Sequence, residues 1–411
     1  MNLKFYQILG FFILPFALIR ILFKGFKNNA YWKRIPERFG FYPHIEKNLI
    51  WIHCVSVGEF MAAKPLINKY LETEKLLITC FTPTGYEAIS QAYGNKVIQV
   101  YCPVDIKPFV THFIKTYKPK KCILLETEIW PNIIHELSKN KIPINLINAR
   151  LSQKSFNSYQ RFLSKILSKT LPKIDLIAAQ NEDSKNRLVS LGAKESNTIV
   201  TGNIKFDQNI DINQSQLSEI KKFIQDQQVI VFASTHNDEE KQIFEAIENS
   251  SYLKNALKII VPRHPERFNE VYKLAKKYSY TSAKRSEKTT SESNLEVLIG
   301  DSMGELPEYL YLADVVFMGG SLVKHGGHNM IEPALLEKPI IYGQNVFNFA
   351  QISEELISSG GAIQVDSADA LVAKIESLLN NPIEREELSK NAYKFAKNLQ
   401  GSTNKLIKLV K

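Results

Sequence analysis

Short apolar runs alternate along this chain with longer stretches in which apolar residues recur at helical spacing. In the first half the runs cover residues 49–55, 76–81, 97–101, 122–125, 144–147, 176–179 and 198–201. The stretches between them include 59–71 and 131–139, whose spacing predicts amphipathic helices. Nearly continuous apolar strands that alternate with helices predict a parallel sheet with helices on both faces.

A polar stretch at residues 207–218, rich in Asn, Asp, Gln and Ser, interrupts this rhythm and is typical of a linker. The alternation restarts after it, with apolar runs at 229–233, 257–261, 295–299, 315–318 and 339–342. We therefore predict two α/β domains, at 28–207 and 208–385, and a helical C-terminal segment at 386–411 that packs back on the first domain. Residues 282–294 are rich in Ser, Thr, Lys and Glu and are predicted to form a mobile loop.

The N-terminus has a different pattern. Residues 5–19 carry no charge and consist mostly of Phe, Ile and Leu, and basic residues follow from Arg20 onward. This run is slightly short for a spanning helix and contains Pro15. We predict that residues 1–27 form a membrane anchor that spans the bilayer or lies in its interface, with a buried helix as the alternative. The basic residues would then face the cytoplasm and anionic lipid.

Charge and cysteine content narrow the functional classes. The 411 residues carry a net charge of +10, which favours nucleic acid, phosphorylated substrates or an anionic membrane surface as partners. The cysteines stand singly, without a CxxC pair, so the sequence contains neither a zinc motif nor a redox motif, and reduced thiols fit a reducing cytoplasm. No GxGxxG follows the strands at 49–55 and 229–233, which argues against a dehydrogenase.

Candidate chemistry lies where the predicted strands end, because ligands bind at the carboxyl edge of such sheets. Glu59 follows the strand at 49–55 and is either a general base or a carboxylate that stabilises the start of a helix. The helix dipole at that position would lower its pKa. Ser56 and Gly58 fit a tight turn whose backbone approaches a ligand.

Other strand ends of the first half offer weaker candidates. The Thr82–Gly85 turn fits a helix N-cap better than a substrate contact. Glu126 and Glu128, with the neighbouring indole of Trp130, suit sugar recognition, although capping by Glu128 is an equal alternative. Arg150 suits a carboxylate or phosphate ligand. Lys205 either reaches a phosphate or is a solvated surface residue.

In the second half, the residues from Met318 to Ala334 give the strongest signal. A strand ends in Gly319 and Gly320, and Ser321 follows; a second pair, Gly326 and Gly327, precedes a helix that starts near Asn329. Amides at such a turn can bind a phosphate, and Glu332 in the first helical turn can bind ribose hydroxyls. His325 and His328 do not form a convincing zinc pair.

Two further turns of the second half are candidates. Arg263 leaves a strand end between two prolines, a rigid presentation that suits a phosphodiester or a carboxylate. The adjacent His264 is weak evidence by itself. The turn from Ala233 to His236 fits a phosphate-binding loop or a helix N-cap.

Taken together and in order, the segments HCVSVGE, TPTG, ETEIWPN, NARLS, TGNIKFD, STHNDEE, VPRHPERF, GDSMGEL and GGSLVKHGGHNMIEPA resemble the 3-deoxy-D-manno-octulosonic acid (Kdo) transferases of Gram-negative bacteria. The resemblance implies two Rossmann-like, doubly wound domains that face a cleft (the GT-B fold) and an N-terminal anchor. It also implies metal-independent, inverting transfer of Kdo from CMP-Kdo to the tetraacyl disaccharide bisphosphate precursor of lipid A. Tyr86 departs from the family pattern after TPTG, so a substrate role at that position is in doubt.

The resemblance also implies roles for individual residues and a location. Glu59 would be the general base, Glu332 would hold ribose, and Lys205 and Arg263 would meet phosphate or the sugar carboxylate. The predicted substrate-binding set is Ser56, Gly58, Glu128, Arg150, Lys205, Arg263, Gly319, Gly320, Ser321, Gly326, Gly327, Asn329 and Glu332. We expect no cofactor, no nucleic-acid partner, and a place on the cytoplasmic face of the inner membrane. The alternatives are a membrane-associated GT-B transferase that uses a UDP-sugar and a non-catalytic nucleotide-binding relative.

Overall fold

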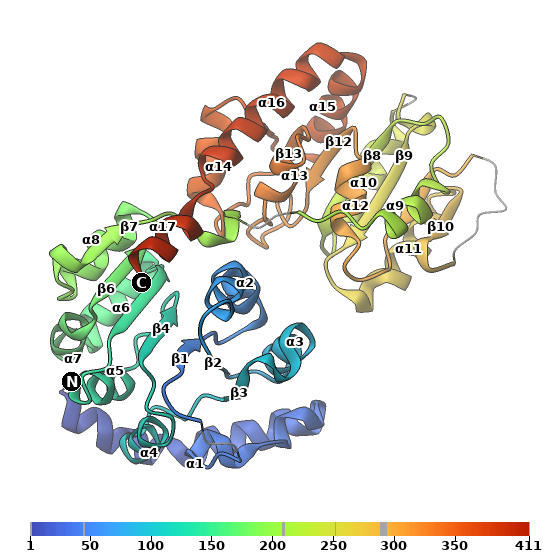
Figure 1. Ribbon diagram of the computed structural model, residues 1–411. Helices are drawn as coiled ribbons and strands as arrows, with labels where there is room; N and C mark the ends of the chain where they lie inside the picture. Colours follow the sequence, from blue (N-terminus) through green and yellow to red (C-terminus); the bar gives the residue numbers. More distant parts are fainter. Residues whose placement is uncertain (1, 44–45, 208–209, 251, 288–293, 411) are drawn as a thin grey trace. The chain divides into compact units, whose positions relative to one another are not determined.

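The computed structural model describes residues 2–43, 46–207, 210–250, 252–287 and 294–410 (Figure 1). The chain forms two compact units. Unit 1 consists of Met1–Gln208 and Leu399–Lys411, and unit 2 of Asn209–Asn398. The predicted pair of α/β domains is confirmed, since each unit contains a seven-stranded parallel sheet.

Unit 1 is built on a sheet with strand order β3-β2-β1-β4-β5-β6-β7. Its strands are β1 (Ile50–His53), β2 (Leu76–Cys80), β3 (Ile98–Tyr101), β4 (Lys121–Leu125), β5 (Ile144–Ala149), β6 (Leu176–Ala179) and β7 (Thr198–Val200). Its helices are α1 (Leu3–Lys27), α2 (Val57–Leu71), α3 (Pro83–Tyr93), α4 (Lys107–Tyr117), α5 (Pro131–Lys139), α6 (Gln153–Phe162), α7 (Ser164–Thr170), α8 (Glu182–Ser190) and α17 (Ser402–Leu409). Short 3-10 helices include η1 (Asn29–Trp32), η2 (Ile35–Phe39) and η6 (Ile204–Asp207).

The strands of unit 1 are apolar along their whole length because helices cover both faces of the sheet. On one face Trp51 and Leu124 pack with residues of α4, α5, α7 and α8, such as Phe113 and Ile133. On the other face the core contains residues of α2, α3 and α17. Burial on both faces explains why the apolar runs of the sequence predicted these strands.

Helix α1 is part of unit 1 and runs along one side of it, next to α4 (Figure 1). It is docked by polar contacts. The Tyr6 hydroxyl donates to Asp105 Oδ2 at 2.8 Å, and Gln7 Nε2 donates to Asn132 Oδ1 at 2.9 Å. Its other side exposes large apolar side chains, namely Phe5, Ile8, Phe11, Phe12, Phe16, Ile19, Leu22, Phe23 and Phe26. We call these nine residues the outer face of α1.

Among the described residues, no single helix is long and apolar enough to cross a membrane. The segments Leu3–Phe12 and Leu14–Phe26 of α1 meet the length and composition criteria only as a pair, bent by 44°. Pro15 lies just beyond the bend, where its ring removes a backbone hydrogen bond and displaces the preceding turn. The membrane anchor predicted for residues 1–27 therefore stays a prediction.

Unit 2 repeats the architecture, with strand order β10-β11-β9-β8-β12-β13-β14. Its strands are β8 (Val229–Thr235), β9 (Leu257–Pro262), β10 (Ser282–Lys284), β11 (Val297–Ile299), β12 (Val315–Met318), β13 (Ile340–Tyr342) and β14 (Ala362–Gln364). Its helices are α9 (Gln214–Lys221), α10 (Glu239–Glu248), α11 (Phe268–Lys277), α12 (Leu306–Leu312), α13 (Ile331–Leu335), α14 (Ala350–Ser358), α15 (Ala368–Asn380) and α16 (Pro382–Asn398).

The structure departs from the sequence predictions in several segments. The predicted linker is wrong for residues 214–218, where α9 begins after its N-cap Asn213. The predicted loop at 282–294 is wrong at its start, which forms β10 and a 3-10 turn, while residues 288–293 lie outside the described residues. The chain stays in unit 2 through α16 and returns to unit 1 at Leu399, later than the predicted residue 386. In unit 1, Asp207 accepts the Gly401 amide at 2.6 Å and holds the start of α17.

Candidate active site

Glu59 lies at the carboxyl edge of the unit 1 sheet, in the first turn of α2. The helix begins there because Ser56 is its N-cap, in an extended conformation with its Oγ accepting the Glu59 amide. The Glu59 side chain turns back toward the strand, and its Oε2 accepts the Val55 amide at 2.7 Å. Gly58 is exposed beside it. The side chain of Glu59 is therefore held in place by the turn between β1 and α2.

Burial dominates the electrostatics of Glu59, which is only 8% exposed. Desolvation of the carboxylate raises its pKa from 4.5 to about 8, and the nearby carboxylates of Glu126 and Glu128 act in the same direction. The Val55 amide and the charge of Lys205 lower the pKa by less. The helix dipole, which predicted a lowered pKa, is thus outweighed. A carboxyl group with a pKa near neutral pH is suited to general-base catalysis.

Lys205 lies at the same edge of the sheet and pairs with Glu126, Nζ to Oε1 at 2.5 Å. The loop that carries Lys205 is held by Asn148, whose Oδ1 accepts the Ile204 amide at 3.2 Å. Asn148 is fully buried at the end of β5 with φ +52°, a conformation that asparagine tolerates better than most residues. In the NARLS segment it is therefore Asn148 that connects this strand end to the lysine.

Glu128 is held by the indole of Trp130, whose Nε1 donates to Glu128 Oε2 at 2.6 Å. Burial raises the pKa of Glu128. His53 Nε2 lies 4.0 Å from the same oxygen. His53 is fully buried and its pKa is lowered to about 4, so it is neutral at pH 7 and does not form a salt bridge with Glu128.

The remaining positions of unit 1 that the sequence singled out are Thr82, Tyr86 and Arg150. Arg150 is exposed, and its backbone carbonyl accepts from Thr127 Oγ1 at 2.7 Å. Thr82 is the N-cap of α3 and accepts the Gly85 amide at 3.1 Å, as the capping interpretation predicted. Tyr86, which departs from the family pattern, lies under the guanidinium of Arg34 at 4.8 Å from the ring centre.

In unit 2 the first glycine pair follows β12. Gly319 has no room for a side chain, since a Cβ there would lie 2.7 Å from the Ser234 carbonyl oxygen. The amides of Gly320, Ser321 and Leu322 all donate to the carboxylate of Glu239, at 2.8 to 3.1 Å. Glu239 is fully buried at the start of α10. Since a carboxylate already occupies these donors, the first glycine pair shapes the loop and does not present free amides to a phosphate in this structure.

The second glycine pair leads to Glu332. Gly326 and Gly327 have φ values of +94° and +72°, which a residue with a Cβ rarely adopts. Asn329 Nδ2 then donates to Glu332 Oε1 at 3.1 Å. Burial raises the pKa of Glu332, while Asn329 and the charge of Arg263 lower it by less. Arg263 is exposed, and its backbone amide donates to the Thr235 carbonyl at 3.0 Å.

A cluster of histidines, none of which was assigned a role of its own from the sequence, lies beside these residues. His236 stacks on His325 and His328, with ring centres 4.1 and 5.1 Å apart, and meets His264 edge-on at 5.4 Å. His236 Nε2 and His328 Nε2 share a hydrogen bond of 2.8 Å. Burial, then the neighbouring imidazoles and Arg263, lower the pKa of both rings to about 4. The signal in the sequence was that these histidines follow β8, β9 and β12, which are neighbours in the sheet.

Metal ligands do not gather in either unit: within the described ranges, no group of three or more His, Cys, Asp or Glu side chains is placed to hold a metal ion. The four cysteines are buried and free. Burial raises the pKa of each thiol above its ordinary value, so they are unreactive core residues.

Two α/β units, each with a seven-stranded parallel sheet and charged side chains at its carboxyl edge, give the chain a two-domain fold of the GT-B-like class. The fold is similar to that of a solved UDP-GlcNAc 2-epimerase from Neisseria meningitidis, with a TM-score of 0.62 at 16% identity, over 88% of this chain and 99% of that chain. The family model for glycosyl transferases group 1 matches residues 213–395.

The family follows from the N-terminal unit and from whole-chain relatives. The family model described as 3-deoxy-D-manno-octulosonic-acid transferase (kdotransferase) matches residues 33–208. A 3-deoxy-D-manno-octulosonic acid transferase of Haemophilus influenzae is 39% identical over 99% of this chain and 97% of the relative. One from Rickettsia bellii is 30% identical over 99% of both. The chain belongs to the Kdo transferase family and is an enzyme of that family, which confirms the resemblance drawn from its motifs.

Proposed function

We propose that this enzyme transfers Kdo from CMP-Kdo to a hydroxyl of the tetraacyl disaccharide 1,4'-bisphosphate precursor of lipid A, with inversion at the anomeric carbon, in lipopolysaccharide inner-core synthesis. The observation that carries the proposal is Glu59. It is a buried carboxyl at the carboxyl edge of the unit 1 sheet, with a pKa raised to about 8 and a fixed hydrogen bond from Val55. In its ionised form, Glu59 can take the proton of a sugar hydroxyl as the hydroxyl oxygen attacks the donor.

The remaining chemistry requires cations and not a general acid. CMP leaves as a phosphate monoester anion, so the bond to the anomeric carbon can break without protonation of the leaving oxygen. We assign Arg263 to the negative charge of the donor and Glu332 to its ribose hydroxyls. Fixed positive charge at a departing phosphate is among the larger contributions to such catalysis. We expect Lys205 to steady the ionised form of Glu59, because its charge lowers the pKa of that carboxyl.

The membrane location is part of the proposal and rests on α1. Its outer face exposes phenylalanines in a row, among them Phe12 at 70% and Phe23 at 67%. Arg20 and Lys24 lie on the same helix. An apolar helix face with basic residues beside it is typical of a helix at a membrane interface. We propose that α1 attaches the enzyme to the cytoplasmic face of the inner membrane, where the acylated acceptor resides.

Thermal unfolding of the purified full chain with CMP, UDP and their sugar conjugates tests the donor class. We expect CMP and CMP-Kdo to raise the melting temperature and UDP-sugars to leave it unchanged. Stabilisation by UDP-sugars alone would favour the transferase that uses a UDP-sugar. Mass spectrometry of the product from CMP-Kdo and the tetraacyl acceptor then tests transfer. Binding of CMP without any product would favour a non-catalytic relative.

A further inference from the structure

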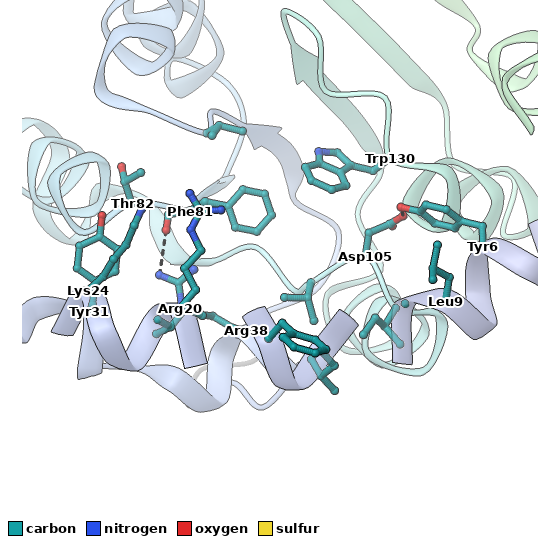
Figure 2. A pocket seen from close by; sticks show the side chains of 17 residues that line it. Tyr6, Leu9, Arg20, Lys24, Tyr31, Arg38, Phe81, Thr82, Asp105 and Trp130 are labelled. Atoms are coloured by element: carbon teal, nitrogen blue, oxygen red, sulfur yellow. Dashed lines mark hydrogen bonds between the residues drawn. The ribbon is translucent and has the colours of Figure 1, made fainter. Parts of the chain in front are cut away.

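A cavity with a volume of 740 Å³ lies within unit 1, between α1 and the carboxyl edge of its sheet (Figure 2). Its walls include residues that follow β1, β2, β3 and β4, such as Val55, Thr82, Ile106 and Trp130. Helix α1 closes the other side. This volume is typical of pockets that enclose a small organic ligand. The cavity lies at the same sheet edge as Glu59. Val55 lines the cavity, and its amide also holds the Glu59 carboxylate.

The two ends of the cavity differ in character. Figure 2 shows Arg20, Lys24 and Arg38 gathered near Thr82 at one end, and Tyr6, Leu9 and Asp105 at the other. The wall contributed by α1 is otherwise apolar, with Leu9, Leu14 and Ile21, and it also includes Phe16 at the border with the outer face. Asp105 lies at the end of the cavity opposite the cations and forms no ion pair with them. Its oxygens already accept the Tyr6 hydroxyl and the amides of Asn132 and Ile133, at 2.8 to 3.0 Å.

Arg38 is the second observation that points to a ligand. It is only 4% exposed, and its guanidinium stacks on the Tyr101 ring at 4.0 Å. Its Nη2 donates to the Phe81 carbonyl at 2.9 Å, but its Nε is buried without a hydrogen-bond partner. Within the part of the chain that the structure describes, neither Arg38 nor Arg20 nor Lys24 forms an ion pair with a carboxylate. A buried cation without a counter-charge is unfavourable, and a bound anion would relieve it.

We propose that this cavity is a binding site for the phosphorylated acyl lipid that accepts the sugar, with one acyl chain between α1 and the sheet edge and a phosphate at Arg20, Lys24 and Arg38. The apolar walls match the chain, and the cationic end matches the phosphate. Because Val55 lines the site and its amide holds Glu59, a lipid bound there would lie beside the base. The proposal rests on the proposed function, since it names the place where that reaction's acceptor binds.

The acyl end is tested by filling it. Leu9→Trp puts an indole into the apolar wall, and Leu409→Trp makes the same substitution at an exposed position of α17, outside the cavity wall. We expect Leu9→Trp to raise the KM for the tetraacyl acceptor about tenfold or more, the effect of losing a few buried methylene groups. Transfer to the same disaccharide bisphosphate without acyl chains, and stabilisation by CMP, should change less than about twofold. Leu409→Trp should match the wild type with both acceptors.

The phosphate end is tested by charge. Arg20 and Lys24 are exposed at the cavity, so Arg20→Gln and Lys24→Gln should fold normally. We expect each to weaken binding of dodecyl phosphate, measured by calorimetry, by about tenfold, and to leave binding of uncharged dodecyl maltoside unchanged. Lys33→Gln, an exposed charge outside the cavity wall, is the control for net charge.

The outcomes separate this site from the reaction itself. If wild-type enzyme transfers Kdo to neither acceptor, the proposed function fails. If it transfers to both and Leu9→Trp loses no more activity with the acylated acceptor than Leu409→Trp does, the acyl site is wrong. If Arg20→Gln, Lys24→Gln and Lys33→Gln bind dodecyl phosphate equally, the phosphate site is wrong. Displacement of dodecyl phosphate by phosphatidylglycerol vesicles but not by the tetraacyl acceptor would show a bulk-lipid site and also overturn the proposal.

Discussion

The Val55 amide donates a 2.7 Å hydrogen bond to Glu59 Oε2 across the turn between β1 and α2. This bond favours the ionised carboxylate, and so does the start of the helix. Burial opposes both and is the larger effect, so the pKa rises to about 8. The carboxyl group is therefore fixed in position and yet readily exchanges its proton near neutral pH, which is the combination a general base requires.

The raised pKa of Glu59 makes stability depend on pH. Between pH 4.5 and about 8 the unfolded chain releases this proton while the folded chain keeps it, so the free energy of unfolding falls as pH rises through that window. Glu59→Gln removes the effect. We compare the free energies of unfolding of the variant and the wild type by chemical denaturation. Between pH 4 and pH 8.5 we expect their difference to shift by about 2–4 kcal/mol in favour of the variant. Glu72→Gln, at the exposed far end of α2, is the control, and an equal gain in both variants would contradict the argument.

Glu239 should control the order of the glycine loop. It accepts the amides of Gly320, Ser321 and Leu322 from a fully buried position. Glu239→Ala leaves these donors unsatisfied, so we expect a loss of about 2–4 kcal/mol in the free energy of unfolding and faster hydrogen exchange at those amides. Glu248→Ala, on the exposed last turn of α10, should change neither. Unaltered hydrogen exchange at residues 320–322 in Glu239→Ala would show that the loop keeps its conformation without the Glu239 carboxylate.

Arg263 should act on the donor. Its position at the end of β9, beside the histidine cluster and near Glu332, places a cation where the leaving phosphate is proposed to bind. We expect Arg263→Ala to reduce kcat/KM for CMP-Kdo at least tenfold while the acceptor KM changes little. Lys277→Ala removes a charge from the exposed end of α11 and should behave as the wild type. A donor kcat and KM that both stay normal in Arg263→Ala would remove it from the site.

The outer face of α1 should bind membranes. Phe12→Glu and Phe23→Glu each place a charge on this face, so we expect co-sedimentation with vesicles of phosphatidylglycerol and phosphatidylethanolamine to fall at least several-fold. Phe162→Glu, an exposed phenylalanine on α6, makes the same change elsewhere in unit 1 and should leave binding intact. Equal losses in all three variants would mean that added charge, and not the helix face, governs the result.

The sequence predicted most of the fold because each central strand is buried on both faces. Runs such as those that became β1, β8 and β12 therefore contain few polar residues. The strands it missed, β10 and β14, are short edge strands with sequences SAK and AIQ. Propensity has little to act on there, and pairing with a neighbouring strand decides the structure.

The sequence indicated at which strand ends the candidate residues lie, but not what surrounds them. In each unit the strand ends indicated the candidates, Glu59 and Lys205 in unit 1 and Arg263 and Glu332 in unit 2, because the parallel strands of one sheet share one carboxyl edge. The pKa of Glu59 could not be read from sequence, because it depends on burial and on Glu126 and Glu128, which lie far along the chain. For the same reason the sequence did not reveal that Glu239 accepts hydrogen bonds from the amides of residues 320–322.

The central claim, that Glu59 is the general base, is tested most directly by the turnover of Glu59→Gln with CMP-Kdo and the tetraacyl acceptor. Glutamine keeps an oxygen for the Val55 amide but cannot take a proton. We expect kcat to fall by about 10²–10⁴-fold, the usual contribution of general-base catalysis, while CMP stabilises the variant as it does the wild type. A kcat within about threefold of the wild type would contradict the assignment, since even modest general-base assistance exceeds that factor.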